Sequence, residues 1–290
     1  MLGTGADAPA SVAELQEQLR GVEYLADRGL ATASLIALRL GRPLLLEGEV
    51  GVGKTELAKC LARLTGRELI RLQCYEGIDA GQALYEWDYA RQLLKVRASD
   101  GNQGEIDHLF TTEFLVERPL LQAVRAGDRC VLLIDEIDRA DDEFEAFLLE
   151  LLSDFQITIP EVGTVAAEGR PIVILTSNRT RELHDALKRR CLYHWIGYPA
   201  AHEEVDIVRV RAPDVSDTLA ATVVASVNRL RDLDLTKPPG VAETLDWVQA
   251  LGAIGVDELN ADTAADTIGA VVKDRDDLDA VVPDIARVVG

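Results

Sequence analysis

The sequence predicts an α/β fold with a parallel sheet, followed by a smaller helical domain. Apolar strand-like segments alternate with helical ones up to about residue 199. Segments 44–46, 131–135 and 171–176 are almost entirely apolar. Strands that are apolar on both faces are typical of a parallel sheet covered by helices on both sides. Beyond residue 199, Ala, Val, Leu and Asp recur at helical spacing, so we expect two domains, 1–199 and 200–290.

The amino-terminal elements follow from capping and periodicity. Ser11 followed by Glu14 forms a capping box, which indicates the start of a helix. Pro43 ends a second apolar-periodic segment, because proline cannot continue a helix. The further elements expected up to residue 127 are a helix at about 22–40, a strand at 44–46, a helix at 54–64, a strand at 68–73 and a mostly helical stretch at about 78–127 with a polar break at 99–105.

The second half of the first domain continues the same alternation. Ile157 and Ile159 alternate with polar residues before a Pro160 turn, which predicts a hairpin. The elements expected here are a strand at 131–135, a helix at 141–152, the hairpin at 156–164, a strand at 171–176, a helix at 181–188 and a strand at 192–196.

Composition excludes several classes of protein. Hydrophobic residues make up 48% and charged residues 28% of the chain, as in ordinary folded proteins. No apolar run approaches the roughly 18–20 residues that cross a bilayer, so we expect no membrane span. The amino terminus does not have the pattern of a secretory signal. The four cysteines form no Cys-x-x-Cys pair, which favours a reducing cytoplasm.

The chain is strongly acidic, with a formal net charge of −20. Repulsion from phosphate argues against binding nucleic acid along an open face, because such binders present clustered Lys and Arg. The acidic surface indicates either adaptation to salt or a selective partner. The sequence does not separate these two interpretations.

A glycine-rich segment follows the first buried strand and precedes a helix. It matches the phosphate-binding pattern G-x-x-x-x-G-K-[S/T] in full. Its glycines allow backbone N–H groups to surround an anion, and the helix that follows directs its positive dipole end at the same phosphates. The segment predicts that ATP binds here, with the lysine on the β- and γ-phosphates and the threonine hydroxyl on Mg²⁺. Its residues are Gly48, Glu49, Val50, Gly51, Val52, Gly53, Lys54 and Thr55.

Two acids end the apolar strand at 131–135. The carboxyl ends of parallel strands are where ligands of such sheets bind. We expect Asp135 to hold Mg²⁺ and Glu136 to polarise the attacking water as a general base. The alternative is that both acids only cap the following helix. A complete phosphate loop in the same chain favours the catalytic role over the capping role. The acid pair in turn favours hydrolysis over phosphotransfer, because a kinase rarely places a water-activating glutamate directly after its magnesium ligand.

Two further residues are candidates for the site. Asn178 comes just after the strand at 171–176 and would orient the water, although an asparagine also suits any turn. Arg190 ends a helix just before the last strand. Basic residues there either complement the helix dipole or provide an arginine finger for a neighbouring subunit. The residues alone leave this open.

Together these motifs resemble the AAA+ superfamily, and within it the MoxR-type ATPases. The stretches similar to the family are RPLLLEG at 42–48, FLVERPLL at 114–121 and DEIDRA at 135–140. LQCYEG at 72–77 and ALKRRCLYHW at 186–195 resemble the CoxD-like subgroup, which is encoded beside molybdenum hydroxylases of the carbon monoxide dehydrogenase type.

The resemblance implies a sheet in the order 5-1-4-3-2, a helical lid, and nucleotide at the subunit junctions of a ring, usually a hexamer. It makes Asn178 the polar sensor and Arg190 the arginine finger, with Arg189 as the fallback. It also implies two insertions, a hairpin at 156–166 and a second one that includes 99–105. The lid lacks the arginine of the family's second sensor, so either Lys237 replaces it or the lid reads the nucleotide state differently.

By resemblance, the function is a chaperone-like remodeller that uses ATP and Mg²⁺ to mature the metal centre of a client enzyme. A protein with a von Willebrand factor A domain would be its partner. A nucleotide-gated switch that hydrolyses ATP slowly is the main alternative, and a nucleic-acid motor is disfavoured by the acidic composition. The residues do not identify the client or its metal.

Overall fold

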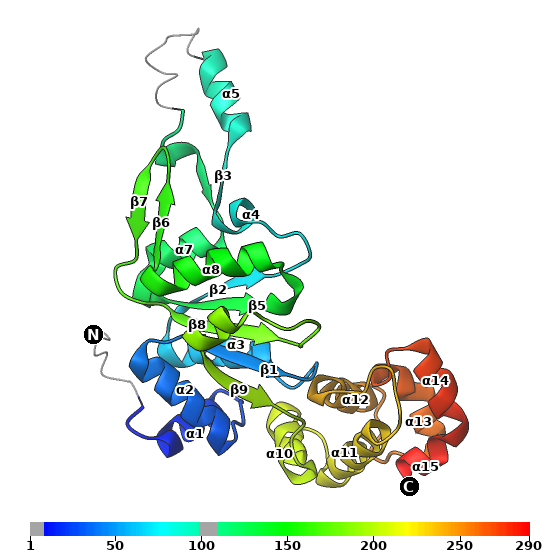
Figure 1. Ribbon diagram of the computed structural model, residues 1–290. Helices are drawn as coiled ribbons and strands as arrows, with labels where there is room; N and C mark the ends of the chain where they lie inside the picture. The colour runs from blue at the N-terminus through cyan, green and yellow to red at the C-terminus, as the bar shows by residue number, and fades with distance from the viewer. Residues whose placement is uncertain (1–8, 99–108) are drawn as a thin grey trace. The chain divides into compact units, whose positions relative to one another are not determined.

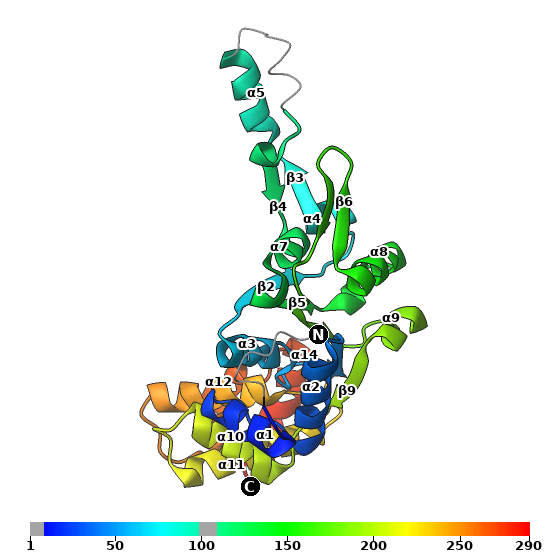
Figure 2. The same cartoon turned by 90° about the vertical axis from the view of Figure 1, so that its left-hand side faces the viewer.

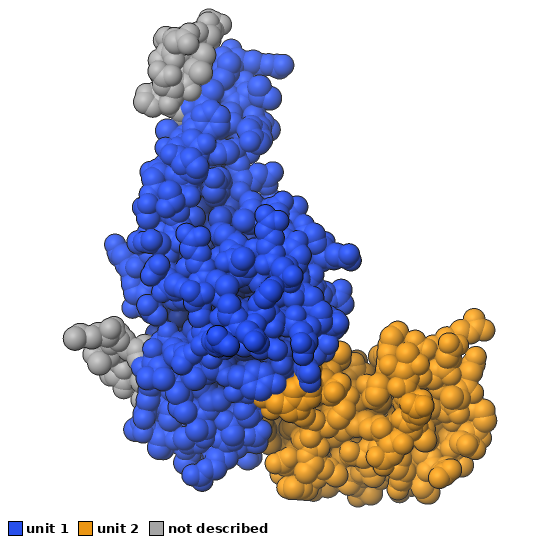
Figure 3. All heavy atoms as spheres, in the orientation of Figure 1, with its two compact units in different colours: residues 1–22, 26–47, 57–194 blue, residues 23–25, 48–56, 195–290 orange. Residues whose placement is uncertain are grey.

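A computed structural model describes residues 9–98 and 109–290 (Figure 1). The polar break expected at 99–105 lies outside these residues. The chain divides into two compact units, drawn in different colours in Figure 3. The first holds the described residues up to Val22, together with Ala26–Glu47 and Leu57–His194. The second holds Glu23–Leu25, Gly48–Glu56 and Trp195–Gly290.

Five strands form the main sheet within the described part of the chain. In sheet order they are β2 (Glu68–Gln73), β5 (Cys130–Asp135), β8 (Ile172–Ser177), β1 (Leu44–Gly48) and β9 (Leu192–Ile196). The pairs β2–β5, β5–β8 and β8–β1 are parallel. Numbered along the chain, these strands stand in the order 5-1-4-3-2, so the expected fold class and strand order are confirmed.

Both faces of the interior strand β5 are buried. Leu132 and Ile134 belong to the core formed with α7 (Pro119–Ala126) and α8 (Asp142–Asp154). Val131 and Leu133 are also fully buried, and they point to the opposite face because side chains alternate along a strand. This double burial explains why the sequence of the strand reads as one apolar run.

Local signals in the sequence fix most helix boundaries. Ser11 caps the first helix by accepting a hydrogen bond from Glu14 N at 3.1 Å. The second helix begins at Arg28 rather than near residue 22, because Asp27 caps it by accepting from Leu30 N at 2.8 Å. The helices of this part of the chain are α1 (Val12–Gly21), α2 (Arg28–Leu40), α3 (Lys54–Thr65), α4 (Ala80–Leu84), α5 (Tyr89–Ala98) and α9 (Asp185–Arg190).

The stretch at 78–127 holds helices as expected, namely α4, α5 and α7, but it is not helical throughout. It contains two short strands, β3 (Tyr85–Trp87) and β4 (Leu115–Glu117), which pair antiparallel. Each strand has three residues and its partner is far away in the sequence, so no local periodicity marks it. Figures 1 and 2 both show that α5 extends from these strands away from the main sheet.

The structure also tests the expected hairpin at 156–164 and the expected helix at 181–188. The hairpin is confirmed, as β6 (Gln156–Ile159) pairs antiparallel with β7 (Gly163–Ala166). The helix expected at 181–188 instead runs from Asp185 to Arg190.

The second unit is helical after β9. Its helices pack around the fully buried Trp247, Val248 and Leu251. They are α10 (Ala201–Arg211), α11 (Asp217–Arg231), α12 (Val241–Ala253), α13 (Ala261–Thr267), α14 (Arg275–Val281) and α15 (Ile285–Val289). In the parts of the chain described, no helix has both the length and the apolar composition needed to cross a bilayer.

Candidate active site

The glycine-rich loop has the backbone that its sequence predicts. Gly48, Gly51 and Gly53 adopt φ values of 155°, 76° and 92°, which L side chains rarely allow. A Cβ added at Gly48 would clash with the carbonyl oxygen of Ile196. Close approach of backbone to backbone therefore requires glycine at this position. Loop residues with such φ values can turn successive N–H groups toward an anion, as a phosphate-binding loop requires.

Lys54 begins α3 directly after this loop. It is 6% exposed, and its ammonium donates to the carbonyl oxygens of Gly48 at 2.8 Å and Glu49 at 2.6 Å. The helix has 12 residues, so its amino-terminal N–H groups and its dipole favour an anion at the same place. Thr55, in the first turn, is half-buried. The residues at this helix end fit the phosphates and the magnesium ion of a nucleotide.

Asp135 ends β5 as a buried carboxylate, 2% exposed. Its Oδ1 accepts from the Thr176 hydroxyl at 2.5 Å, and its Oδ2 accepts from Arg71 Nη2 at 2.5 Å. Thr176 lies on β8 and Arg71 on β2, the two strands that flank β5. A carboxylate held between two neighbouring strands is a preorganised oxygen ligand of the kind that Mg²⁺ prefers.

Glu136 follows Asp135 in a strained conformation. Its φ and ψ are 54° and 50°, the left-handed region that costs a non-glycine residue about 1–3 kcal/mol. Its N–H donates to the Thr176 hydroxyl at 2.9 Å, which holds this conformation. The Glu136 carboxylate lies 2.8 Å from Arg139 Nε and is one-third exposed. A carboxylate that is partly exposed is accessible to a water molecule, as a general base requires.

The segment after β8 is tied to the segment after β5. Thr180 donates from its N–H and its hydroxyl to Asp138 Oδ2, at 2.9 Å and 2.8 Å. Arg179, between Asn178 and Thr180, has a positive φ of 57°. Asn178 is half-buried. Asn178 therefore lies between two residues that are bonded to the β5 end, Thr176 to Asp135 and Thr180 to Asp138, at the carboxyl edge of the sheet.

The acids produce a negative field at this edge. Burial, followed by the charges of Asp135, Asp138 and Glu136, raises the pKa of the Cys74 thiol to about 12. Cys74 N also donates to the carbonyl oxygen of Asp135 at 2.8 Å. A thiol with this pKa stays protonated at neutral pH and is not a nucleophile. The field favours a cation beside the acids.

Arg190 lies at the opposite edge of the same sheet. Arg42, just before β1, donates from Nη2 to the Arg189 carbonyl oxygen at 2.9 Å and from Nε to that of Arg190 at 3.4 Å. Leu192 N donates to the carbonyl oxygen of Pro43 at 2.8 Å. The end of α9 is thus fixed to the amino edge of the sheet, whereas Asp135 stands at the carboxyl edge.

The side chains of both arginines at the end of α9 are exposed. Within the described residues, neither Arg189 nor Arg190 has an ion-pair partner. Three backbone carbonyl oxygens at the end of this helix accept from the Arg42 guanidinium. Arg42 therefore fixes the backbone from which Arg190 projects, and it leaves the Arg190 guanidinium available.

Lys237, the candidate replacement for the arginine of the second sensor, forms an ion pair with Asp274. Its ammonium lies 3.0 Å from Asp274 Oδ2, and the hydrogen bond from Lys237 is the main reason that the pKa of Asp274 is lowered. The residue that approaches Gly51 is Glu243, whose Oε2 would lie 2.8 Å from a Cβ at that glycine. The helical unit thus places a carboxylate, rather than a cation, beside the phosphate loop.

Sequence reasoning missed four polar residues of this region: Glu47, Arg71, Asp138 and Thr176. Glu47 is 3% exposed and accepts from the Ser177 hydroxyl at 3.2 Å. Glu47, Arg71 and Thr176 each interrupt an apolar strand-like run, and Asp138 lies in the short turn that follows β5. That interruption is a usable signal, because a buried polar side chain needs a partner.

Comparison with known proteins agrees with this architecture. A protein-family model described as AAA domain (dynein-related subfamily) matches residues 43–191, slightly more than half of the chain. The protein YehL of Escherichia coli is 34% identical over 165 residues, which are 54% of this chain and 41% of YehL. This chain thus spans about two fifths of that relative.

Two further relatives are matched over most of their length. The denitrification regulatory protein NirQ of Pseudomonas aeruginosa is 26% identical over 226 residues, 76% of this chain and 78% of NirQ. The gas vesicle ATPase GvpN1 of Halobacterium salinarum is 26% identical over 261 residues, 83% of this chain and 72% of GvpN1.

Solved structures show the same fold. A proline-to-glycine mutant of RuvB from Thermotoga maritima superposes with a TM-score of 0.52 and 19% identity, over 93% of this chain and 75% of RuvB. At this identity the likeness concerns the fold alone. The family model, which covers more than half of the chain, shows the family: the chain belongs to the AAA domains of the dynein-related subfamily.

Proposed function

We propose that this protein hydrolyses ATP with magnesium, using the phosphate loop at 48–55 and the acids Asp135 and Glu136. The observation that carries this proposal is the acid pair at the carboxyl end of β5, where Thr176 holds both the Asp135 carboxylate and the Glu136 backbone. The relative GvpN1 is itself described as an ATPase.

Each residue has a distinct role in this proposal. The loop amides and Lys54 bind the β- and γ-phosphates. Asp135 and the Thr55 hydroxyl hold the magnesium ion, which when bound would neutralise charge on the phosphate oxygens. Glu136 takes a proton from the attacking water, and the amide of Asn178 orients that water. In this proposal, residues 1–199 form the ATPase core and residues 200–290 form the lid.

We further propose that the active form is a ring, by family resemblance a hexamer. Arg190 projects from the amino edge of the sheet, and Asp135 stands at the carboxyl edge. Leu46 on β1 is level with Asp135 in the register of the sheet. Pro43, which marks the amino edge beside the end of α9, lies three residues before Leu46, or roughly 10 Å along the strand direction. This separation favours an Arg190 that acts on the nucleotide of a neighbouring copy, where a finger contributes about 10³–10⁵ in rate.

The broader role that we propose is that of a MoxR-type remodeller that assists a client enzyme. Support comes from relatives described as regulatory or as ATP-binding subunits, among them NirQ and the Clp protease subunit ClpL of Lactococcus lactis. A metalloenzyme client, a partner with a von Willebrand factor A domain and a place in the CoxD-like subgroup remain part of this proposal by resemblance. A cytoplasmic location is likewise proposed.

Mixing two inactive variants tests the shared site. Lys54→Ala removes phosphate binding but leaves Arg190, and Arg190→Ala does the reverse. Each variant alone is expected to show almost no ATP turnover. Mixtures should recover turnover that depends on their ratio, because some junctions combine an intact loop with an intact finger. A complete lack of recovery at every ratio, with assembly verified by sedimentation, would contradict a finger that acts between copies.

A further inference from the structure

The phosphate loop packs against the helical part of its own compact unit. Gly48–Glu56 and Trp195–Gly290 belong to the same unit. Within it, the loop meets the start of α12, whose first residue is Val241. The Ala242 N–H donates to the carbonyl oxygen of Gly51 at 3.1 Å. The first turn of this helix therefore holds one of the loop's own carbonyl groups.

Two glycines make this contact close. A Cβ added at Gly240 would lie 2.5 Å from the Val50 carbonyl oxygen and 2.8 Å from the Gly51 Cα, and both of these are backbone atoms. A Cβ added at Gly51 would lie 3.1 Å from the Gly240 Cα, and Gly51 also has a φ of 76°. Backbone atoms cannot move aside as the end of a flexible side chain can. The contact therefore requires glycine on both sides.

The backbone of Gly240 is fixed by residues of α12. Its carbonyl oxygen accepts from Thr244 N at 3.2 Å, and its N–H donates to Glu243 Oε2 at 2.8 Å. Thr244 is fully buried, and its hydroxyl donates to the buried carboxylate of Glu204 at 2.6 Å. Both polar groups of the Gly240 backbone are thus bonded, so the turn that touches the loop is held in place by the interior of the helical unit.

The hydrogen bond to Gly51 also orients a donor of the loop. The Gly51 carbonyl and the Val52 N–H belong to one planar trans peptide, in which the two groups point in opposite directions. Because the carbonyl is directed at α12, the Val52 N–H is directed away from that helix. This N–H is one of the loop amides that bind phosphate in the proposed function. A contact made by the helical unit therefore sets the direction of a phosphate-binding group.

We propose that the first turn of α12 is a positioning element for the phosphate loop, and that Gly240 and Ala242 act through Gly51 on the binding of ATP and ADP. This inference rests on the proposed function, because it concerns the same loop. The helical unit then needs no second-sensor arginine at this contact, since it sets the shape of the loop instead of touching the γ-phosphate. Both nucleotides should depend on the turn, because both present a β-phosphate to the loop.

Nucleotide affinity of the full chain tests the role of Gly240. The probes are Mg·ATP and Mg·ADP, and isothermal titration calorimetry measures their dissociation constants. Gly240→Ala should weaken both by about tenfold or more, because the new Cβ separates the turn from the loop and frees the Gly51 carbonyl. Gly252→Ala is the matched control, since a Cβ added at this glycine of α12 would meet nothing within 4 Å. It should bind both nucleotides like the wild type.

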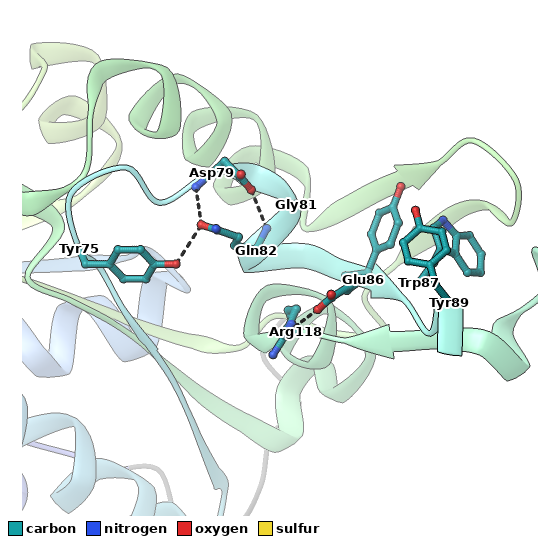
Figure 4. A pocket seen from close by; sticks show the side chains of 9 residues that line it. Tyr75, Asp79, Gly81, Gln82, Glu86, Trp87, Tyr89 and Arg118 are labelled. Carbon is teal, nitrogen blue, oxygen red and sulfur yellow. Dashed lines mark hydrogen bonds and ion pairs between the residues drawn. The ribbon is translucent and has the colours of Figure 1, made fainter. Parts of the chain in front are cut away.

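Glu243 gives a second test that adds no atoms at the contact. Glu243→Ala and Glu243→Gln both remove the negative charge beside Gly51, but only glutamine keeps an oxygen that accepts from Gly240 N. The alanine variant should therefore bind both nucleotides about two- to fivefold more weakly than the glutamine variant. Glu86 lies outside this compact unit and pairs with Arg118 at 2.5 Å (Figure 4). The same two substitutions at Glu86 should give equal affinities.

The outcomes separate this inference from the proposed function. Wild-type affinity in Gly240→Ala, with folding verified by circular dichroism, would overturn the inference alone. A loss for ATP without a loss for ADP would assign the turn to the γ-phosphate and also overturn it. If Gly240→Ala does not fold, equal affinities of Glu243→Ala and Glu243→Gln would have the same consequence. A wild type that binds neither nucleotide, as expected only of Lys54→Ala, would refute the proposed function together with this inference.

Discussion

The Arg71 guanidinium lies 2.5 Å from the Asp135 carboxylate, the group that we assign to the magnesium ion. Arg71 also donates to Gln73 Oε1 at 2.5 Å, so β2 presents a fixed positive charge to the end of β5. The guanidinium and a magnesium ion would compete for the same oxygen. In the proposed site, magnesium affinity would therefore be set in part by a residue on the neighbouring strand.

Replacing Arg71 should make magnesium bind more tightly. In Arg71→Gln, the magnesium concentration that gives half-maximal ATP turnover is expected to fall about two- to fivefold. The effect is modest because the Arg71 side chain is 49% exposed and water screens its charge. Arg20→Gln, which removes an exposed arginine at the end of α1, should leave that concentration unchanged. A rise in the Arg71→Gln variant would show that Arg71 supports metal binding.

Arg42 should contribute to turnover only through Arg190. Arg42→Ala removes the donor to three carbonyl oxygens at the end of α9, and we expect turnover to fall about tenfold, less than for Arg190→Ala. The double variant should be no slower than Arg190→Ala alone, because a residue that positions another has nothing left to position. Multiplicative losses in the double variant would instead show that the two residues act independently.

The buried ion pair of the helical unit should be important for its stability. Glu204 is fully buried, accepts from Arg231 at 2.6 Å and 2.8 Å, and accepts from the Thr244 hydroxyl at 2.6 Å. Glu204→Ala leaves Arg231 buried and unpaired, so the free energy of unfolding should fall by about 3–5 kcal/mol. Asp206→Ala breaks an exposed pair with Arg209 on the same helix and should cost less than about 1 kcal/mol. Urea denaturation followed by circular dichroism measures both, and equal losses would refute this ranking.

Stability should fall in alkali because of buried thiols. The pKa of Cys74 is raised from 9.0 to about 12, by burial first and then by Asp135, Asp138 and Glu136. Between these values the unfolded thiol has lost its proton and the folded one has kept it. The unfolded state then binds fewer protons, so the free energy of unfolding decreases as pH rises.

Removing one such thiol should reduce that dependence. From pH 8 to pH 10, Cys74→Ala is expected to lose about 1.4 kcal/mol less stability than the wild type. Cys191→Ala should behave in the same way, because burial raises the pKa of Cys191 to about 12 as well. Urea denaturation at the two pH values gives this comparison. Identical pH dependence in all three proteins would mean that the thiols ionise equally in the folded and unfolded states.

The sequence predicted the main sheet because its strands carry their own signal. Residues 131–135 are buried on both faces and read as one apolar run, and the loop glycines have backbone angles that almost require glycine. The phosphate-binding pattern at 48–55 was therefore enough to predict Lys54 and its loop. Asp135 and Glu136 followed from their position at the end of a strand.

Other features depend on partners that are distant in the sequence. Tyr85–Trp87 pairs with Leu115–Glu117 across a long stretch of chain, and neither strand has the length to show alternation. The roles of Arg71 and Thr176 exist only because β2 and β8 flank β5.

The central claim is that ATP held by Lys54 is hydrolysed by a water molecule activated by Glu136. Its most direct test is to measure binding and turnover of radiolabelled Mg·ATP in the same preparations of wild type, Glu136→Gln and Lys54→Ala. The account predicts that Glu136→Gln binds ATP as tightly as the wild type but turns it over about a hundredfold more slowly or worse, and that Lys54→Ala does not bind it. Wild-type turnover in Glu136→Gln, or no ATP binding by the wild type, would contradict it.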